Sequence, residues 1–269
     1  MQKFKMPIRE QNSNKGTFGK VLNICGSKNF IGAAYLSTIS SLKVGAGYSA
    51  LASTKDVIRS VSALLPEAVY LDRKDCLTKL NEFNVVLIGC GLGLDFASQS
   101  LFKHVFKRLQ KVTIPIIIDA DGLNLLSKYS CKLPNSTIIT PHPLEASRLL
   151  GCSLEEVLAN LEESAKKLTQ KYDCITVLKT HETIICNKNL EIYINQHGNS
   201  ALAKAGSGDV LAGVIAGLLA QKMEPFEATK LGVYLHSRTG EIASKELTEY
   251  SVLASDLPKY LYKAIREIL

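Results

Sequence analysis

An α/β fold built on a mostly parallel sheet is the architecture that this sequence of 269 residues predicts. Short runs rich in β-branched residues alternate along the chain with helical patterns, and this alternation is typical of strand–helix–strand units. Several runs, such as VVLI at 85–88 and IPIII at 114–118, are apolar throughout. Such strands are expected where helices cover both faces of a parallel sheet.

Four predicted strand–helix units are followed by a different pattern. The units pair residues 20–25 with 32–44, 84–89 with 96–110, 113–119 with 122–128, and 136–140 with 143–150. From Cys174 onward, CITVLKT, TIICN and EIYINQ follow one another with short polar breaks, which predicts a short antiparallel addition to the sheet. Three helical segments come last, at 208–222, 225–245 and 254–268. No linker or repeat interrupts the chain, so we expect one domain over residues 1–269.

The composition indicates a globular protein and disfavours one class of function. The chain is 46% hydrophobic and 21% charged, which is an ordinary balance for a globular protein. Its net charge of +7 suits an anionic ligand. The basic residues are spread out apart from the stretch at 103–111, which we expect to be a solvated helix face. With 7% aromatic residues and no tryptophan, a nucleic-acid-binding protein is disfavoured.

The sequence predicts a cytoplasmic protein with reduced thiols and no membrane contact. Residues 1–16 contain no apolar signal segment, and the longest apolar run, at 210–220, is too short to cross a bilayer. The seven cysteines form no CxxC pair, and several lie in apolar runs, so we expect unpaired thiols in the core. These cysteines are Cys25, Cys76, Cys90, Cys131, Cys152, Cys174 and Cys186.

Five polar or glycine-rich clusters each follow a predicted strand. They are CGSKNFIG at 25–32, GCGLG at 89–93, DADG at 119–122, TPHP at 140–143 and KTHET at 179–183. In an open α/β sheet, the loops at the carboxyl ends of the strands line the ligand crevice. We therefore expect the five clusters to face one site.

Three common enzyme motifs do not fit these clusters. GCGLG is not the GxGxxG of dinucleotide-binding folds, and no acidic residue stands about 20 positions beyond it. GTFGKV at 16–21 lacks the P-loop spacing and precedes a strand. Ser207, in AGSGD, lacks the spacing of a serine hydrolase nucleophile.

The stretch AGSGDVLAG at 205–213 places a carboxylate at the start of an apolar helix. Gly206 and Gly208 leave backbone N–H groups unobstructed, and the positive end of the helix dipole attracts an anion such as phosphate. The dipole would keep Asp209 ionised, so that it accepts a hydroxyl proton during phosphoryl transfer. Alternatively, Asp209 only caps the helix, while Gly213 and Gly217 permit close helix packing.

Four motifs in this order, GCGLG, DADGLN, TPHPLE and AGSGDVLAG, make the sequence resemble the ribokinase-like superfamily, and more narrowly the ADP-dependent NAD(P)H-hydrate dehydratases. The resemblance extends from about Lys15 to Lys263. It implies a three-layer αβα sandwich with a mostly parallel central sheet and a short antiparallel addition. It also implies repair of hydrated nicotinamide cofactors: ADP phosphorylates the ring hydroxyl of (6S)-NADHX or NADPHX, and loss of phosphate regenerates NADH or NADPH, with AMP and phosphate as by-products.

The resemblance also implies roles for individual residues. Asp209 corresponds to the proton acceptor for the ring hydroxyl. The residues implied for ADP are Lys179, Thr180, His181, Glu182, Thr183 and Gly208. Those implied for the hydrated dinucleotide are Ala33, Gly91 and His142, together with Asp209. Glu145 is implied to support Mg²⁺. We expect Asp121 to cap the helix that follows it, although it and Asp119 also suggest a metal site.

Three departures from the family pattern concern the nucleotide site: Cys90 stands where proline is common, Thr180 where glycine is common, and Ser207 where threonine is common. The resemblance further implies a homo-oligomer such as a tetramer. Because the motifs begin near the start of the chain, we expect a separate epimerase. Two alternatives stay open, a ribokinase-like small-molecule kinase and a catalytically silent nucleotide-sensing module. Whether ADP or ATP is the donor, and whether NADHX or NADPHX is preferred, is also open.

Overall fold

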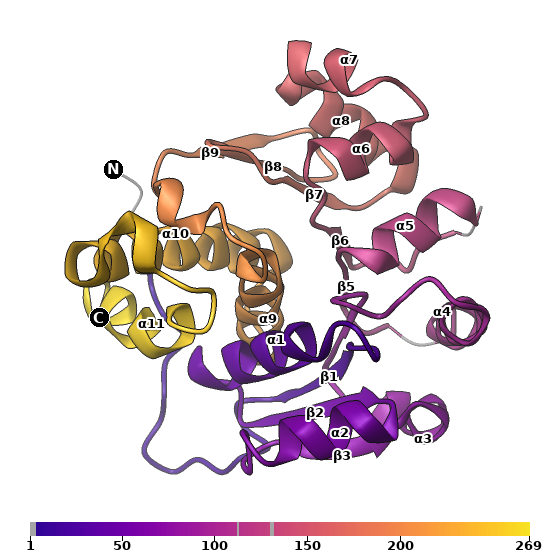
Figure 1. Ribbon diagram of the computed structural model, residues 1–269, viewed down its shortest axis with the longest axis vertical. Helices are drawn as coiled ribbons and strands as arrows, with labels where there is room; N and C mark the ends of the chain where they lie inside the picture. Colours follow the sequence, from indigo (N-terminus) through magenta and orange to yellow (C-terminus); the bar gives the residue numbers. More distant parts are fainter. Residues whose placement is uncertain (1–3, 112, 130–131) are drawn as a thin grey trace.

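Nine strands form one sheet in the computed structural model, which describes residues 4–111, 113–129 and 132–269 (Figure 1). The strand order is β3-β2-β1-β4-β5-β6-β7-β8-β9. All neighbours from β3 to β7 are parallel, whereas β8 pairs with β7 and with β9 in antiparallel fashion. The strands are β1 (Lys20–Ile24), β2 (Tyr48–Ser53), β3 (Val69–Asp72), β4 (Val85–Ile88), β5 (Ile116–Ile118), β6 (Thr137–Ile139), β7 (Ile175–Leu178), β8 (Thr183–Cys186) and β9 (Ile192–Asn195).

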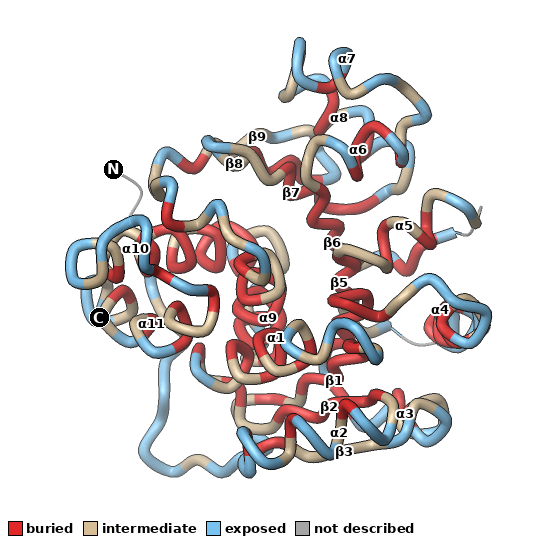
Figure 2. Tube along the Cα trace, in the orientation of Figure 1, coloured by how far each residue is buried: buried red, intermediate tan, exposed pale blue. Residues whose placement is uncertain are grey.

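Helices cover both faces of the sheet and form the outer two of three layers. Successive residues of β4 point to opposite faces: Val85 and Leu87 belong to one core cluster, Val86 and Ile88 to the other. Figure 2 shows the central strands buried between these layers. The first cluster packs against α1 (Ile31–Lys43), α2 (Lys55–Ser62), α9 (Ser207–Ala220), α10 (Pro225–Ser251) and α11 (Leu257–Arg266). The second packs against α3 (Arg73–Lys79), α4 (Phe96–Leu109), α5 (Asp121–Lys128), α6 (Pro143–Leu150), α7 (Leu154–Ala159) and α8 (Leu161–Tyr172).

The predicted elements are confirmed where the sequence pattern was strong. The four strand–helix units correspond to β1–α1, β4–α4, β5–α5 and β6–α6, and the antiparallel addition is β8 and β9. The pattern did not identify β2, α2, β3 and α3 between residues 45 and 83, because YSALAS in β2 contains no β-branched residue. Helix α10 extends beyond the predicted 225–245 to Ser251, with a kink at Thr248, where φ is +66°.

The basic stretch and most of the described cysteines lie where the sequence predicts them. The basic stretch at 103–111 lies on α4 and just beyond it, with its charged side chains exposed, as predicted. The described cysteines are unpaired and, apart from the partly exposed Cys152, buried. Cys131 lies outside the described residues. None of the helices in the described ranges is long and apolar enough to span a membrane.

Helix α9 packs closely on α1 through two glycines. A Cβ atom at Gly217 would lie 2.3 Å from Val44 Cγ1 and 2.5 Å from Ser41 O. At Gly213 it would lie 2.3 Å from Ser37 O. The predicted close helix packing at these glycines is therefore confirmed, and it fixes the position of the N-terminus of α9.

We expect Gly217→Ala to lower the free energy of unfolding by about 1–3 kcal/mol, because the added methyl group overpacks the α1–α9 contact. Urea denaturation measures this change. Gly32→Ala is the matched control, since nothing lies within 4 Å of a Cβ atom at Gly32 and alanine there favours the helix. An unchanged unfolding midpoint for Gly217→Ala would contradict the packing argument.

Candidate active site

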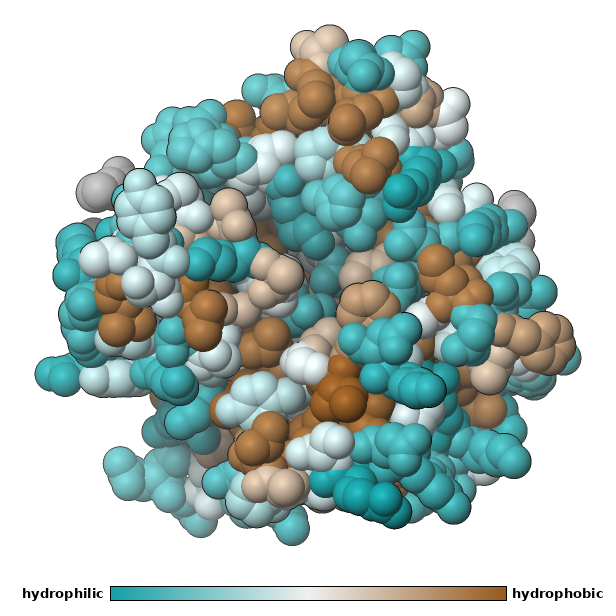
Figure 3. All heavy atoms as spheres, in the orientation of Figure 1, coloured by the Kyte–Doolittle hydropathy of each residue, from teal (hydrophilic) through white to brown (hydrophobic). Residues whose placement is uncertain are grey.

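A cavity of about 800 Å³ lies where the carboxyl ends of β5, β6 and β7 meet the N-terminus of α9. Figure 3 shows a hollow near the middle of the molecular surface in this view. Three of the five predicted strand-end clusters, DADG, TPHP and KTHET, contribute to its wall, together with AGSGD. Its polar lining includes Asp119, His142, Glu145, Lys179, Ser207 and Asp209.

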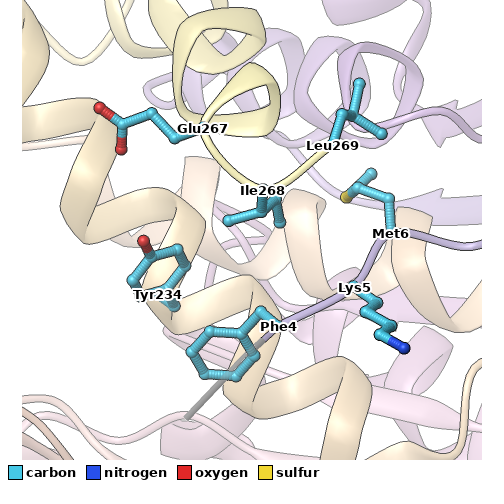
Figure 4. A pocket seen from close by; sticks show the side chains of 7 residues that line it. All are labelled: Phe4, Lys5, Met6, Tyr234, Glu267, Ile268 and Leu269. Atoms are coloured by element: carbon cyan, nitrogen blue, oxygen red, sulfur yellow. The ribbon is translucent and has the colours of Figure 1, made fainter. Parts of the chain in front are cut away.

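A second cavity, of about 570 Å³, lies where the two ends of the chain meet. Phe4, Met6 and Ile268 lie along it together with Tyr234 of α10 (Figure 4). The carboxylate of Glu267, at its edge, accepts hydrogen bonds from Arg238. None of the strand-end clusters lines this cavity, and its charged side chains, Lys5 and Glu267, point away from each other in Figure 4, so it is not the candidate active site.

Asp209 occupies the first turn of α9, at the wall of the 800 Å³ cavity. The residue before the helix, Gly206, has φ of +93°, and a Cβ atom there would lie 2.6 Å from Leu36 Cδ1. Glycine is therefore required to start the helix at this point. No side chain caps the N-terminus of α9. The capping alternative for Asp209 is thus wrong. Ser207 N donates to Lys204 O at 3.2 Å, so the N–H groups of Gly208 and Asp209 are the ones that face a ligand in the first turn.

Burial, reinforced by the negative charge of the neighbouring Asp119, raises the pKa of Asp209 to about 7. We expected the helix dipole to lower the pKa of Asp209 and keep it ionised, and this expectation is wrong, because burial and Asp119 raise the pKa. Taking the carboxylate out of water and placing it beside another carboxylate outweighs the dipole. A carboxylate with this pKa is a stronger proton acceptor than an exposed aspartate.

The partly exposed Lys179 and the buried Asp119 form an ion pair in the wall of the cavity. Lys179 Nζ lies 2.7 Å from Asp119 Oδ1 and 3.9 Å from Glu145 Oε2. Thr140 Oγ1 donates to the same Oδ1 at 2.7 Å. Burial alone would lower the pKa of Lys179, but the carboxylates of Asp119 and Glu145 raise it, so the lysine is charged.

This cation lies next to the start of α9. Lys179 Nζ is 3.4 Å from the position of a Cβ atom at Gly208, and Asp119 Oδ2 is 3.8 Å from it. The predicted nucleotide residues Lys179 and Gly208 are therefore brought together. Sequence reasoning suggested only a metal site for Asp119 and did not pair it with Lys179, which lies 2.7 Å away.

His142 and Glu145 form the N-terminal capping box of α6. Leu144 N donates to His142 Nδ1 at 3.2 Å, and His142 N donates to Glu145 Oε2 at 2.8 Å. Burial raises the pKa of Glu145 to about 7 despite the nearby positive charge of Lys179. Burial and Lys179 also lower the pKa of His142, which favours a neutral imidazole.

The remaining predicted nucleotide residues follow Lys179 in one turn. Thr180, His181 and Thr183 line the same cavity. Thr180 Oγ1 donates to Glu182 O at 2.6 Å, which closes the turn. Glu182 itself is exposed and faces an adjoining surface pocket.

Ala33, in the first turn of α1, and Gly91, in the loop after β4, lie against each other. A Cβ atom at Gly91 would be 2.8 Å from that of Ala33. Neither residue belongs to the lining of the 800 Å³ cavity. They adjoin it through Cys90, whose Sγ lies 3.7 Å from Asp119 Oδ2 and within 4.8 Å of a carboxylate oxygen of Asp209.

The predicted cap for α5 is wrong. Asp121 is the first residue of α5, whose N-cap is Ala120, and no side chain caps this helix. Asp121 Oδ2 instead accepts a hydrogen bond from Gly93 N at 2.8 Å. The carboxylate therefore joins the loop after β5 to the loop after β4.

A buried histidine that also lines the cavity contacts the first residue of α9, a contact that sequence reasoning missed. His236 Nε2 lies 3.0 Å from both the hydroxyl and the carbonyl oxygen of Ser207. Burial lowers the pKa of His236 to about 4, so the ring is neutral. The signal was weak, because His236 lies in the middle of a long helix.

Comparison with protein families and curated proteins identifies similar chains. A family model described as NAD(P)H-hydrate dehydratase matches residues 21–263. The ADP-dependent (S)-NAD(P)H-hydrate dehydratase of Neisseria meningitidis serogroup B is 36% identical, over 87% of this chain and 80% of that protein. A bifunctional NAD(P)H-hydrate repair enzyme of Thermofilum pendens is 35% identical over 98% of this chain. The chain spans about half the length of that relative, 53%.

Solved structures have the same architecture. An ADP/ATP-dependent NAD(P)H-hydrate dehydratase from Bacillus subtilis, co-crystallised with ATP/Mg²⁺, superimposes with a TM-score of 0.89 and 30% identity, over 98% of this chain and 95% of that chain. A ribokinase-like superfamily protein from Enterococcus faecalis has a TM-score of 0.84 and 34% identity, over 96% of this chain and 92% of its own. The predicted ribokinase-like three-layer fold is therefore confirmed.

Proposed function

This chain belongs to the NAD(P)H-hydrate dehydratase family, and from that premise we propose that it catalyses the ADP-dependent dehydration of (6S)-NADHX or NADPHX to NADH or NADPH, with release of AMP and phosphate. The observation that carries the proposal is the position of Asp209. Its carboxylate, with a pKa raised to about 7, stands at the uncapped start of α9, beside the charged Lys179.

In the first step, the N–H groups at the start of α9 bind the transferring phosphate of ADP. Lys179, next to Gly208, neutralises the charge on this phosphate. Asp209 accepts the proton of the ring hydroxyl while the hydroxyl oxygen attacks the β-phosphorus, and the P–O bond to AMP breaks.

In the second step, the ring carbon–oxygen bond breaks and the phosphate leaves with the bonding electron pair. Loss of a proton from the adjacent ring carbon then restores the double bond of NADH or NADPH. The prior phosphorylation matters because a hydroxyl group is a poor leaving group, whereas phosphate is a good one. The overall reaction removes one water from the hydrate and cleaves ADP to AMP and phosphate.

Mg²⁺ fits this site through Glu145. The ion takes oxygen ligands and keeps several waters, and when bound it neutralises charge on the phosphates of the donor. Both carboxylate oxygens of Glu145 have protein neighbours: Oε2 accepts the His142 N–H, and Oε1 lies 3.6 Å from His142 Nε2. Glu145 therefore suits contact with Mg²⁺ through water rather than direct ligation.

We also propose the remaining site residues and partners. The KTHET turn holds the adenosine part of ADP, and Ala33, Gly91 and His142 contact the hydrated dinucleotide. Residues 1–269 act as one domain, in a homo-oligomer such as a tetramer. An epimerase activity supplies the (6S) hydrate from the other epimer.

The function is tested by adding ADP to the protein with purified hydrated NADH and following the reduced-nicotinamide absorbance. Recovery of the absorbance, with one AMP formed per NADH, supports the proposal. Accumulation of a stable phosphorylated product identifies a small-molecule kinase instead. Nucleotide binding without any turnover identifies a sensing module.

We expect kcat/KM to rise about tenfold per pH unit below pH 7 and to level off above it. The reason is that Asp209, with its pKa of about 7, accepts a proton only when it is ionised. A pH–rate profile measures this rise of kcat/KM below pH 7, the acid limb of the profile. Glu145 also has a pKa of about 7, so Glu145→Gln is the control that must retain the limb. A flat profile between about pH 5.5 and 8 would exclude Asp209 as the base.

A further inference from the structure

Arg73, the first residue of α3, reaches under two of the glycine-rich loops. Its Nη2 donates to Gly26 O at 2.7 Å and to Leu92 O at 3.0 Å. Its Nη1 donates to Ser98 Oγ at 3.2 Å. Gly26 belongs to the loop after β1, and Leu92 to the loop after β4. One guanidinium group thus donates hydrogen bonds to both loops.

These two loops also contact each other directly. Gly26 N donates to Cys90 O at 2.8 Å. A Cβ atom at Gly91 would lie 2.5 Å from Phe30 Cβ, which leaves little room between the loops. A shift of either loop therefore displaces Ala33 and Gly91 relative to each other.

The clamped loops are linked to the phosphate side of the site. Ser98 Oγ, which accepts from Arg73, donates in turn to Leu92 O at 2.8 Å. The following residue, Gly93, donates its N–H to Asp121 Oδ2 at 2.8 Å. Asp121 lies two positions from Asp119, which holds Lys179. The contacts of Arg73 therefore end at the two glycine-rich loops and Ser98, and the ion pair is held by other groups, Thr140 and Glu145.

We propose that Arg73 is a positioning residue for the hydrated dinucleotide. This inference rests on the proposed function, which assigns the dinucleotide to Ala33 and Gly91. Arg73 is not part of the cavity lining, so it acts through the loops rather than by touching the ligand. The planar guanidinium presents several N–H donors in a fixed fork. A lysine ammonium lacks this fork and does not hold both carbonyl groups in the same geometry.

The test is Arg73→Lys, which keeps the charge and removes the fork. We expect the KM for hydrated NADH to rise at least about tenfold, because the loops no longer hold the geometry that binds it. The Kd for ADP, measured by calorimetry, stays within about twofold, since KTHET and α9 are not bonded to Arg73. Arg59→Lys, at an exposed arginine of the neighbouring α2, is the matched control and leaves both constants unchanged.

Amide hydrogen exchange gives a readout that is independent of turnover. In Arg73→Lys, we expect faster exchange at 26–33 and 89–93 and unchanged exchange at 179–183. If this variant fails to fold, Arg73→Gln, which is shorter, uncharged and lacks the guanidinium fork, takes its place with the same expectations.

Two results would overturn the inference: an unchanged KM for hydrated NADH, or an equal rise in KM and in the Kd for ADP, which indicates general loosening of the protein. A wild-type protein that binds ADP but never converts the hydrate refutes the proposed function, and with it the assignment of the dinucleotide. In that case, unchanged exchange at 26–33 would refute the clamp as well.

Discussion

Asp209→Asn is expected to lower kcat at least about a thousandfold, because asparagine has nearly the same shape but cannot accept the hydroxyl proton. The substitution leaves Gly206, Gly208 and the first-turn N–H groups of α9 in place. Affinity for ADP is therefore expected to stay within about threefold. Stopped-assay kinetics with hydrated NADH and calorimetry with ADP measure the two quantities separately.

Asp121→Asn is the matched control for this prediction. Asp121 is a carboxylate from a neighbouring strand-end loop, and its contact is with Gly93 N. The amide oxygen of asparagine can accept the same hydrogen bond, so we expect less than about a tenfold loss of kcat. An Asp209→Asn protein that keeps more than about a tenth of the wild-type rate would refute the proposed base.

Asp209→Asn is also expected to stabilise the protein above pH 7. A carboxyl group with a raised pKa binds its proton more tightly in the folded protein than in the unfolded chain, where the ordinary value is 3.8. Its contribution to stability is present at low pH, and is lost as the pH rises through about 7. The difference in Tm between variant and wild type is therefore expected to grow between about pH 4 and 7 and to stay constant above pH 7. A variant with a lower Tm at pH 8 would contradict this account and would also weaken the kinetic comparison.

Much of the sheet could be predicted because its central strands are fully buried. In a chain where strands alternate with helices, short apolar runs such as VVLI in β4 and IPIII at β5 indicate strands buried on both faces. The β2 and β3 strands could not be identified, since they are edge or near-edge strands of small and mixed residues. Their identity depends on pairing with β1, which is a tertiary contact.

The site could be predicted only as a meeting of loops. Parallel strands bring their carboxyl ends to one edge, and this rule alone assembled TPHP, KTHET and DADG. The ion pair between Lys179 and Asp119 joins residues 60 positions apart, and no local pattern shows it. The pKa of Asp209 was predicted in the wrong direction, because the helix dipole can be inferred from sequence but burial and the closeness of Asp119 cannot.

Lys179→Met is expected to impair both stability and activity. Asp119 is 1% exposed, and without the ammonium group 2.7 Å away it becomes a buried charge without a counter-ion. Breaking a buried pair in this way costs about 3–5 kcal/mol of unfolding free energy. The loss of the cation beside Gly208 is also expected to lower kcat/KM for ADP at least about a hundredfold, since it neutralises the transferring phosphate.

The double variant Asp119→Asn/Lys179→Met separates the two effects. Removing the orphaned carboxylate is expected to restore more than half of the lost unfolding free energy, since no charge is then left buried. Activity is not restored, because the cation for the phosphate is still missing. Lys179→Arg keeps the charge and is expected to retain most of the stability. Recovery of turnover in the double variant would show that Lys179 only neutralises Asp119 and does not act on the nucleotide.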